Sequence, residues 1–330
     1  MIGRRGLALL GGAAAVSLGA PLLLRPEGEV QGRIAPGALA FPGLASRLVA
    51  AVRIEIRRGA QTTTLIRNGE SWGIGEVHGY PARRERIREV LTGLTELRLV
   101  EERSSDPAQW PRLGVEDPQA PGSTAMLLRV LDGQGAVIAE AILGRRRTRT
   151  QGNQPESVYF RRPGESRNWL AEGRIGAEAD PALWLNRDLS GLAPARLRRV
   201  EINRANAPPL VLARAGEVDA PLDIVTPADP PVADRIALDE VGRAFDALSF
   251  VEVRPAFTAE ALGEARFHYT DDVTITVTPH REGDLFWVRL HATGGEEAQT
   301  LQARFHGWAF QLGLWKEKAM IPRLEDLLPS

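Results

Sequence analysis

The chain has 330 residues, and its 41 basic and 42 acidic side chains give a formal net charge of -1. Because basic and acidic side chains are nearly equal in number, the chain has no global electrostatic field that would attract nucleic acid. The sequence contains no cysteine, which excludes disulfides, thiolate metal sites and cysteine nucleophiles. Apolar residues make up 43% of the chain, enough for the packed cores of two domains of ordinary size.

The N-terminal region predicts a membrane segment. Residues 6–24 carry no charge. They follow Arg4 and Arg5 and are followed by Arg25. A helix rises about 1.5 Å per residue, so this segment is long enough to cover a hydrocarbon core of roughly 30 Å. We expect residues 1–25 to form an uncleaved anchor, with a cleaved signal peptide as the alternative. The paired arginines should stay on the cytoplasmic side of a bacterial inner membrane, which places the rest of the chain in the periplasm.

The first predicted element of the folded region is a half-buried strand at residues 52–58, where apolar and charged side chains alternate. A hairpin is expected over residues 62–74. Asn68 and Gly69 separate its two strands, and this dipeptide favours a type I′ turn, in which both central residues have positive φ.

A helix is expected over residues 80–97. Pro81 suits its first turn, where the missing N–H costs no hydrogen bond. Ile87, Leu91 and Leu94 fall on one face, which should pack on a sheet. Further strands are expected in a hairpin over residues 124–144 and in a pair over residues 157–162 and 168–173.

The same order of elements then recurs. A second helix is expected, with Val241, Phe245 and Leu248 on its apolar face. These residues follow Ile87, Leu91 and Leu94 of the first helix by the same number of positions. In this interpretation the hairpin over 272–292 repeats the one over 124–144. The second set comprises strands at 197–204 and 209–215, a helix at 232–250, the hairpin at 272–292 and a strand at 305–312.

These patterns predict an α+β fold. An N-terminal transmembrane helix should precede two similar units, each a mainly antiparallel sheet with one main helix, related by internal duplication. The expected boundaries are an anchor at 1–25, a Pro/Gly/Ala-rich tether at 26–47, unit 1 at 48–175, a connector at 176–196 and unit 2 at 197–330.

Gly69, Ser71 and Gly73 spell the G-x-S-x-G motif of serine hydrolases. In those enzymes the serine lies on a strained turn between a strand and a helix of a parallel sheet. Here Ser71 follows a hairpin turn, and another strand comes next. We therefore favour a structural role for this stretch, with Trp72 packed inward, and keep a hydrolase that uses Ser71 as a distant alternative.

Four of the five histidines lie in the second unit. Imidazole is the commonest metal ligand, so a cluster of them would matter. Their spacing matches no compact ligand motif, and on strands they need not share a face. We therefore expect no metal site and no cofactor from the histidines of this unit, which are His268, His280, His291 and His306.

The strongest local charge lies in residues 144–156, which are expected to form a loop between strands. Guanidinium groups there could bind phosphate or carboxylate through paired N–H donors. The alternative is a solvated loop in a protein rich in arginine. The candidate residues for contact with an anionic lipid or an acidic partner are Arg145, Arg146, Arg147 and Arg149.

A series of phrases in order resembles the family called domain of unknown function 4340. The resemblance covers roughly residues 41–200 well and the remainder more loosely. Its phrases are "FPGLASRLVAAVRIEIRRG", "NGESWGI", "GYPARRERIREVLTGLTEL", "RLGVEDP", "AILG", "VYFRRPGESRNWLAEG" and "LWLNRDL". The resemblance implies a periplasmic protein with one N-terminal anchor, linked to uncharacterised ABC-type export systems and to the auxiliary component of gliding-motility transporters. It implies no catalytic residues.

Together these observations predict a non-enzymatic accessory protein of the inner membrane. Its expected partner is an ABC permease or an auxiliary subunit, and the apolar anchor, rich in small residues, could pack on such a permease. The alternative is a periplasmic module that binds a glycan or a lipid. Nucleic acid is not an expected partner.

Overall fold

A computed structural model describes residues 35–147, 156–216 and 220–329. The expected anchor at 1–25 and residues 26–34 of the expected tether lie outside these residues. The rest of the tether is described and contains a strand at Ala38–Leu39 and a helix at Leu44–Arg47, so the predicted tether extends too far. Within the described ranges, no helix is both long and apolar enough to span a membrane. The anchor therefore stays a prediction from the sequence.

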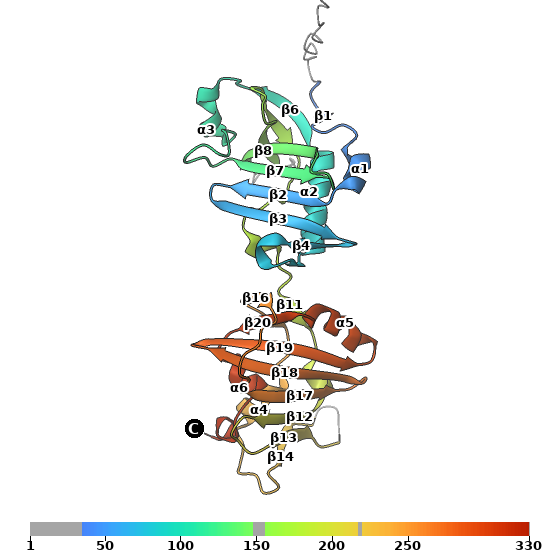
Figure 1. Cartoon of the computed structure of the whole chain (residues 1–330), viewed down its shortest axis with the longest axis vertical. Coiled ribbons are helices and arrows are strands. Elements are labelled where there is room, and N and C mark those ends of the chain that lie inside the picture. Colours follow the sequence, from blue (N-terminus) through green and yellow to red (C-terminus); the bar gives the residue numbers. More distant parts are fainter. Residues whose placement is uncertain (1–34, 148–155, 217–219, 330) are drawn as a thin grey trace, which may run out of the picture. The chain divides into compact units, whose positions relative to one another are not determined.

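Two antiparallel sheets form the folded part of the chain (Figure 1), which confirms the α+β class. The ten-stranded sheet contains β1 (Ala38–Leu39), β2 (Arg53–Arg58), β3 (Gln61–Asn68), β4 (Ser71–Ile74), β5 (Tyr80–Pro81), β6 (Arg98–Arg103), β7 (Met126–Leu131), β8 (Val137–Arg147), β9 (Ser157–Arg161) and β10 (Asn168–Glu172). The eight-stranded sheet contains β12 (Leu197–Arg204), β13 (Leu210–Arg214), β14 (Leu222–Thr226), β16 (Glu252–Pro255), β17 (Gly263–Tyr269), β18 (Val273–Glu282), β19 (Leu285–Gly294) and β20 (Trp308–Leu312). A separate pair joins β11 (Asp188–Ser190) to β15 (Leu248–Ser249).

Helices are short and fewer than strands. They are α1 (Leu44–Arg47), α2 (Arg84–Glu96), α3 (Trp110–Leu113), α4 (Arg235–Gly242), α5 (Glu296–Phe305) and α6 (Lys316–Met320). The longest, α2, buries Ile87, Val90, Gly93 and Leu94 and leaves its other face toward solvent. The predicted apolar face is thus confirmed at Ile87 and Leu94, while Leu91 is only half-buried.

The strands predicted from alternation are confirmed, but the first hairpin turns one residue later than predicted. Asn68 pairs with Ser71, so Gly69 and Glu70 are the central turn residues. Of these, only Gly69 has positive φ, at 62°. Glycine at the first central position is typical of a type II′ turn, so the predicted type I′ turn is wrong.

The first predicted helix is confirmed with a later start. Pro81 pairs with Gly73 in β5, and the Ala82 N–H donates to the Trp72 carbonyl over 2.7 Å. These bonds hold the chain extended as far as Arg83, so the helix begins at Arg84. The placement of Pro81 in the first helical turn is therefore wrong.

The second predicted helix, 232–250, is largely wrong. α4 ends at Gly242, and the chain turns before Leu248 enters β15. Val241, Phe245 and Leu248 are nevertheless all buried, because a turn and a short strand also bring apolar side chains into the core. One main helix per unit is wrong for the second sheet, since α5 is longer than α4.

Both sheets share one order of strands. In the first sheet the order from β4 is β4-β3-β2-β7-β8-β9-β10-β6, and in the second it is β14-β13-β12-β17-β18-β19-β20-β16. In each, the chain passes from the first strand of this order (β4 or β14) through a helix (α2 or α4) to its last strand (β6 or β16). The predicted match of hairpin 124–144 with 272–292 is therefore displaced by one strand, because β7–β8 corresponds to β17–β18.

Tyr80 links residues of the two sheets. Its ring meets those of Phe250, Trp308 and Phe310 edge to face, with centroids 5.1–6.4 Å apart. Its hydroxyl donates to the Asn186 carbonyl over 3.2 Å. Burial raises the pKa of Tyr80 to about 12, with Arg304 acting in the opposite direction. The predicted connector, 176–196, also packs closely, since Trp184 within it is buried.

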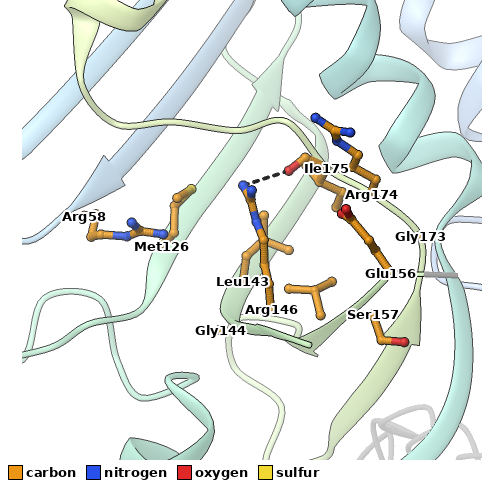
Figure 2. A pocket seen from close by; sticks show the side chains of 11 residues that line it. Arg58, Met126, Leu143, Gly144, Arg146, Glu156, Ser157, Gly173, Arg174 and Ile175 are labelled. Atoms are coloured by element: carbon orange, nitrogen blue, oxygen red, sulfur yellow. Dashed lines mark hydrogen bonds between the residues drawn. The ribbon is translucent and has the colours of Figure 1, made fainter. Parts of the chain in front are cut away.

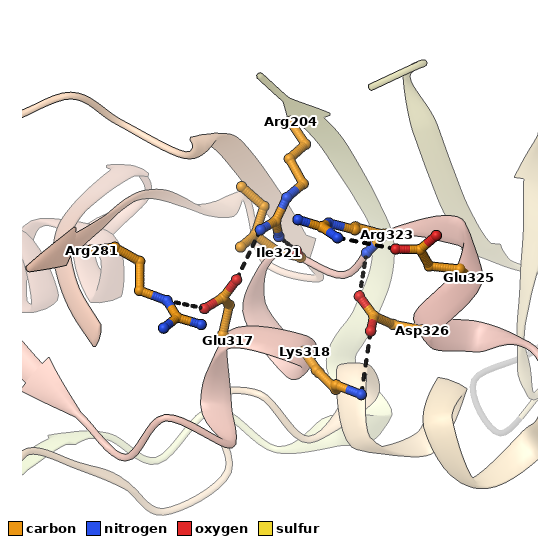
Figure 3. Close-up of polar contacts among 8 residues, drawn as sticks. All are labelled: Arg204, Arg281, Glu317, Lys318, Ile321, Arg323, Glu325 and Asp326. Atoms are coloured by element: carbon orange, nitrogen blue, oxygen red, sulfur yellow. Dashed lines mark hydrogen bonds and ion pairs between the residues drawn. The ribbon is translucent and has the colours of Figure 1, made fainter. Parts of the chain in front are cut away.

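Near the C-terminus, one carboxylate holds α6 against the second sheet (Figure 3). Glu317 accepts a 2.8 Å bond from Arg204 of β12 and a 2.7 Å bond from Arg281 of β18. Arg204 also donates to the Ile321 carbonyl over 2.6 Å. Burial by itself raises the pKa of Glu317, but the two arginines outweigh it and the net pKa lies below the ordinary 4.5.

Replacing Gly93 with alanine should destabilise the fold. A β-carbon at this position would lie 2.2 Å from the Arg174 carbonyl oxygen, which is backbone and cannot swing away. Overpacking costs about 1–3 kcal/mol, which exceeds the helix preference of alanine of about 1 kcal/mol. We expect chemical denaturation to show a net loss of about 1–2 kcal/mol. Gly191→Ala, where no atom lies within 4 Å, is the control and should change stability by less than about 0.5 kcal/mol. A Gly93→Ala protein as stable as the wild type would contradict the close packing of α2.

Glu317→Gln should cost about 2–4 kcal/mol of unfolding free energy, because it leaves the largely buried guanidinium group of Arg204 without its anion and also breaks the more exposed pair with Arg281. The exposed Glu325→Gln, which breaks only the surface pair with Arg323, is the matched control and should be nearly neutral. Since the folded pKa of Glu317 is lowered, its contribution is complete above the unfolded value near 4.5 and is lost as the pH falls through the folded value. Equal losses for both variants would count against this network.

Candidate functional site

A groove of about 470 Å³ lies between the first hairpin and α2. Residues of the hairpin turn, β4 and β5 form one wall, and the outer side of α2 forms the other. Its lining is mainly apolar and consists of Glu70, Ser71, Trp72, Pro81, Ala82, Arg84, Ile87, Arg88, Leu91 and Thr92. A volume of this size lies within the range of about 300–1,000 Å³ that is typical of ligand pockets.

Local pairing fixes the hairpin wall of this groove. Trp72 is opposite Arg67 in the β3–β4 ladder, and its carbonyl is held by the Ala82 N–H. The Trp72 side chain is only half-buried and lines the groove, so the prediction that it packs inward is wrong. An indole that is half open to solvent offers a large apolar contact surface.

The helical wall adds two cations. Arg84 and Arg88 are exposed and one turn apart, so they share one side of α2. Their side chains make no ion pair or hydrogen bond with any described residue. A positive charge in the first turn of a helix is unfavourable for the helix dipole. Arg84 is therefore unfavourable for the helix dipole, and the like charges of Arg84 and Arg88 repel each other four residues apart.

Ser71 lies at the rim of the groove, in the strand that leaves the hairpin turn. Its hydroxyl donates to the Asn68 carbonyl over 3.0 Å, across the turn. The described lining includes no histidine that could act as its general base. The environment is an antiparallel hairpin, as the sequence predicts, and differs from the strand-to-helix turn of a hydrolase.

The expected arginine loop is partly strand. Arg145, Arg146 and Arg147 are the last residues of β8, so their placement in a loop is wrong, while Arg149 lies outside the described residues. Arg146 donates to the carbonyl of Ile175 over 3.1 Å (Figure 2). It also donates to the carbonyl of Ala177 over 3.3 Å, and this part of the chain is held in place as a result.

The cavity beside Arg146 is too small for a ligand. Its volume is about 10 Å³, close to the least that one water molecule needs. Figure 2 shows Arg58, Arg174 and Glu156 around it, and Arg174 is already paired with Glu89 at 2.9 Å. Of the candidate arginines, Arg145 and Arg147 form no side-chain hydrogen bond or ion pair with any described residue, and they stay candidates for anionic contact.

The histidines of the second sheet fall into separate environments. His268 bonds to Thr274 over 3.1 Å, and His280 is buried beneath Arg289. His291 and His306 line one pocket of about 250 Å³. In the described part of the chain, no group of three or more potential ligands is close enough to hold a metal ion.

The groove was missed from the sequence for a physical reason. Its walls come from a hairpin and a helix that meet only in the folded chain. One signal was available: the density of arginines at the start of α2, in "ARRERIRE", is unusual for the positive end of a helix dipole.

Comparison with known proteins gives a family but no characterised relative. No curated protein matches the chain significantly. The family described as domain of unknown function (DUF4340) matches residues 72–267, which is more than half of the chain. The match begins at Trp72, so it includes the lining of the groove from Trp72 to Thr92 and excludes Ser71. The chain is therefore a member of the DUF4340 family.

Proposed function

We propose that this protein is a non-enzymatic accessory protein of the bacterial inner membrane, which binds an envelope partner through the groove between β4 and α2. Residues 1–25 anchor it, and the folded part lies in the periplasm. The observation that carries the proposal is the pairing of a half-open indole, Trp72, with two unpartnered cations, Arg84 and Arg88, along one apolar groove.

The composition of the groove favours a protein partner. Tryptophan and arginine are the residues most enriched among those that dominate binding energy at protein interfaces. The lining positions Arg84, Ile87, Arg88 and Leu91 extend over two turns of α2. Such a groove suits an amphipathic segment that inserts apolar side chains beside the helix. The free arginines select a segment whose apolar residues are flanked by Asp or Glu.

The identity of the partner as an ABC-type permease, or an auxiliary subunit of one, rests on the family resemblance and on the predicted anchor. An anchor with small residues in "GGAAA" and "SLGA" is suited to close packing against a helix of such a permease. In this arrangement the anchor and the groove contact the same complex.

We also infer that the two sheets arose by internal duplication, as the common strand order supports. The duplicates differ where the groove lies. Arg235 is the first residue of α4 and pairs with Asp223 at 2.5 Å, whereas its counterpart, Arg84 of α2, has no partner among the described residues. The second copy neutralises this position internally, and the first leaves it for another molecule.

The alternative function is a periplasmic module that binds a lipid or a glycan. The apolar lining and the volume of about 470 Å³ favour an acyl chain over a sugar. The distant alternative is a hydrolase that uses Ser71; an active-site serine probe that labels the wild type and spares Ser71→Ala would support it.

The accessory function predicts co-purification with permease subunits from solubilised native membranes. The double variant Arg84→Glu, Arg88→Glu should reduce the recovered permease at least tenfold, because it opposes acidic residues on the partner. The variant Arg57→Glu, Arg112→Glu changes the same number of charges at exposed positions outside the groove and should have little effect. Removal of residues 1–25 should release the protein from the membrane and abolish co-purification.

The outcomes separate the candidates. Equal loss in both double variants would indicate a general charge effect and would overturn the assignment of the groove. Recovery of phospholipid in place of permease, lost in Trp72→Ala, would favour the lipid-binding alternative. Recovery of the protein alone after mild crosslinking would contradict the accessory function.

A further inference from the structure

A second pocket, of about 250 Å³, lies on the other sheet, where the β18–β19 hairpin meets the chain between α5 and β20. Its polar lining comes from Thr278 on β18, Arg289 and His291 on β19, and Gln302 and His306 at the end of α5. Cross-strand pairing of Thr278 with Arg289 sets these two side chains next to each other on one face of the hairpin.

Arg289 is held in position from behind. Its Nε–H donates to Nε2 of His280 over 3.2 Å. Because Nε2 accepts this bond, the ring proton of neutral His280 lies on Nδ1, which is 3.1 Å from the Glu260 carbonyl oxygen. Burial, and then the neighbouring Arg289, lower the pKa of His280 and keep the ring neutral. The guanidinium is thus oriented by a buried ring that carries no charge.

The charge of Arg289 has no counterion among the residues that the structure describes. The guanidinium is half-buried, forms no ion pair with any described residue, and no carboxylate lines the pocket. Partial desolvation of a cation costs free energy unless an anion lies close enough to compensate the charge. The remaining N–H groups of Arg289, together with two imidazoles, a hydroxyl and an amide, could donate to one ligand. A metal ion would be repelled by the same guanidinium.

We propose that this pocket binds the phosphoryl group of a small ligand or a lipid headgroup. The hydrogen-bond donors come from two strands and from the end of a helix, so they approach the site from several directions. A tetrahedral phosphoryl group can accept bonds from several directions, whereas a flat carboxylate accepts them mainly in one plane. Phe305 and Trp308 form an apolar wall for the part of the ligand that carries the phosphoryl group. This site is separate from the groove on the first sheet, and its occupation does not depend on the proposed function.

Titration calorimetry of the intact chain with inorganic phosphate and with glycerol phosphate tests the proposal. We expect saturable binding that Arg289→Met weakens at least tenfold. Because that variant also removes the bond to His280, the double variant His291→Ala, His306→Ala serves as a second test. It removes two exposed donors from the pocket and should also weaken phosphate binding. Arg266→Met, which removes an exposed arginine paired with Glu264 at 2.7 Å, is the matched control and should bind as the wild type does.

Flotation with vesicles distinguishes the two sources of the phosphoryl group. Binding to phosphatidylglycerol vesicles that glycerol phosphate competes away identifies a lipid headgroup, whereas binding to glycerol phosphate without binding to vesicles identifies a soluble ester. Either result supports the site if Arg289→Met abolishes it. No saturable binding to any of the probes, equal binding by Arg289→Met, or binding of acetate as tight as phosphate would overturn the proposal.

Discussion

The contact of α2 with the backbone at Arg174 is the constraint on which the candidate site depends. Gly93 is the point of closest approach, because any side chain there would strike the Arg174 carbonyl. Val90, Gly93 and Leu94 are buried, so the side of the helix that carries Arg84 and Arg88 faces outward. The groove follows from this geometry, since its two walls are the hairpin and the side of α2 left uncovered.

The arginines of this chain differ in whether their guanidinium groups bond to other residues of the same chain. Arg146, Arg204 and Arg281 each bond to carbonyls or to a carboxylate of the same chain and hold segments together. Arg84, Arg88 and Arg289 lie at hollow surfaces with no carboxylate partner among the described residues. The groove and the pocket are thus two hollow places in the described part of the chain where a charge is left for another molecule to neutralise.

Local pattern predicts much of this fold, and tertiary contacts determine the rest. Alternation placed β2, β12 and β18 closely, because a half-buried strand requires it. The helical spacing of apolar residues wrongly predicted one helix over 232–250, because a turn and a strand also bury Phe245 and Leu248. α5 was missed although Ala298, Leu301 and Phe305 follow helical spacing. The groove could not be predicted, because whether Arg84 finds a partner depends on residues distant in sequence.

The most direct test of the groove as a partner site is photo-crosslinking in native membranes. A photoreactive residue at Leu91, in the groove, is compared with one at Glu85, an exposed position of the same helix that does not line it. The account predicts that position 91 alone crosslinks to one membrane partner, at a segment of apolar residues flanked by Asp or Glu. Equal crosslinking at both positions, or lipid adducts only at position 91, would contradict it.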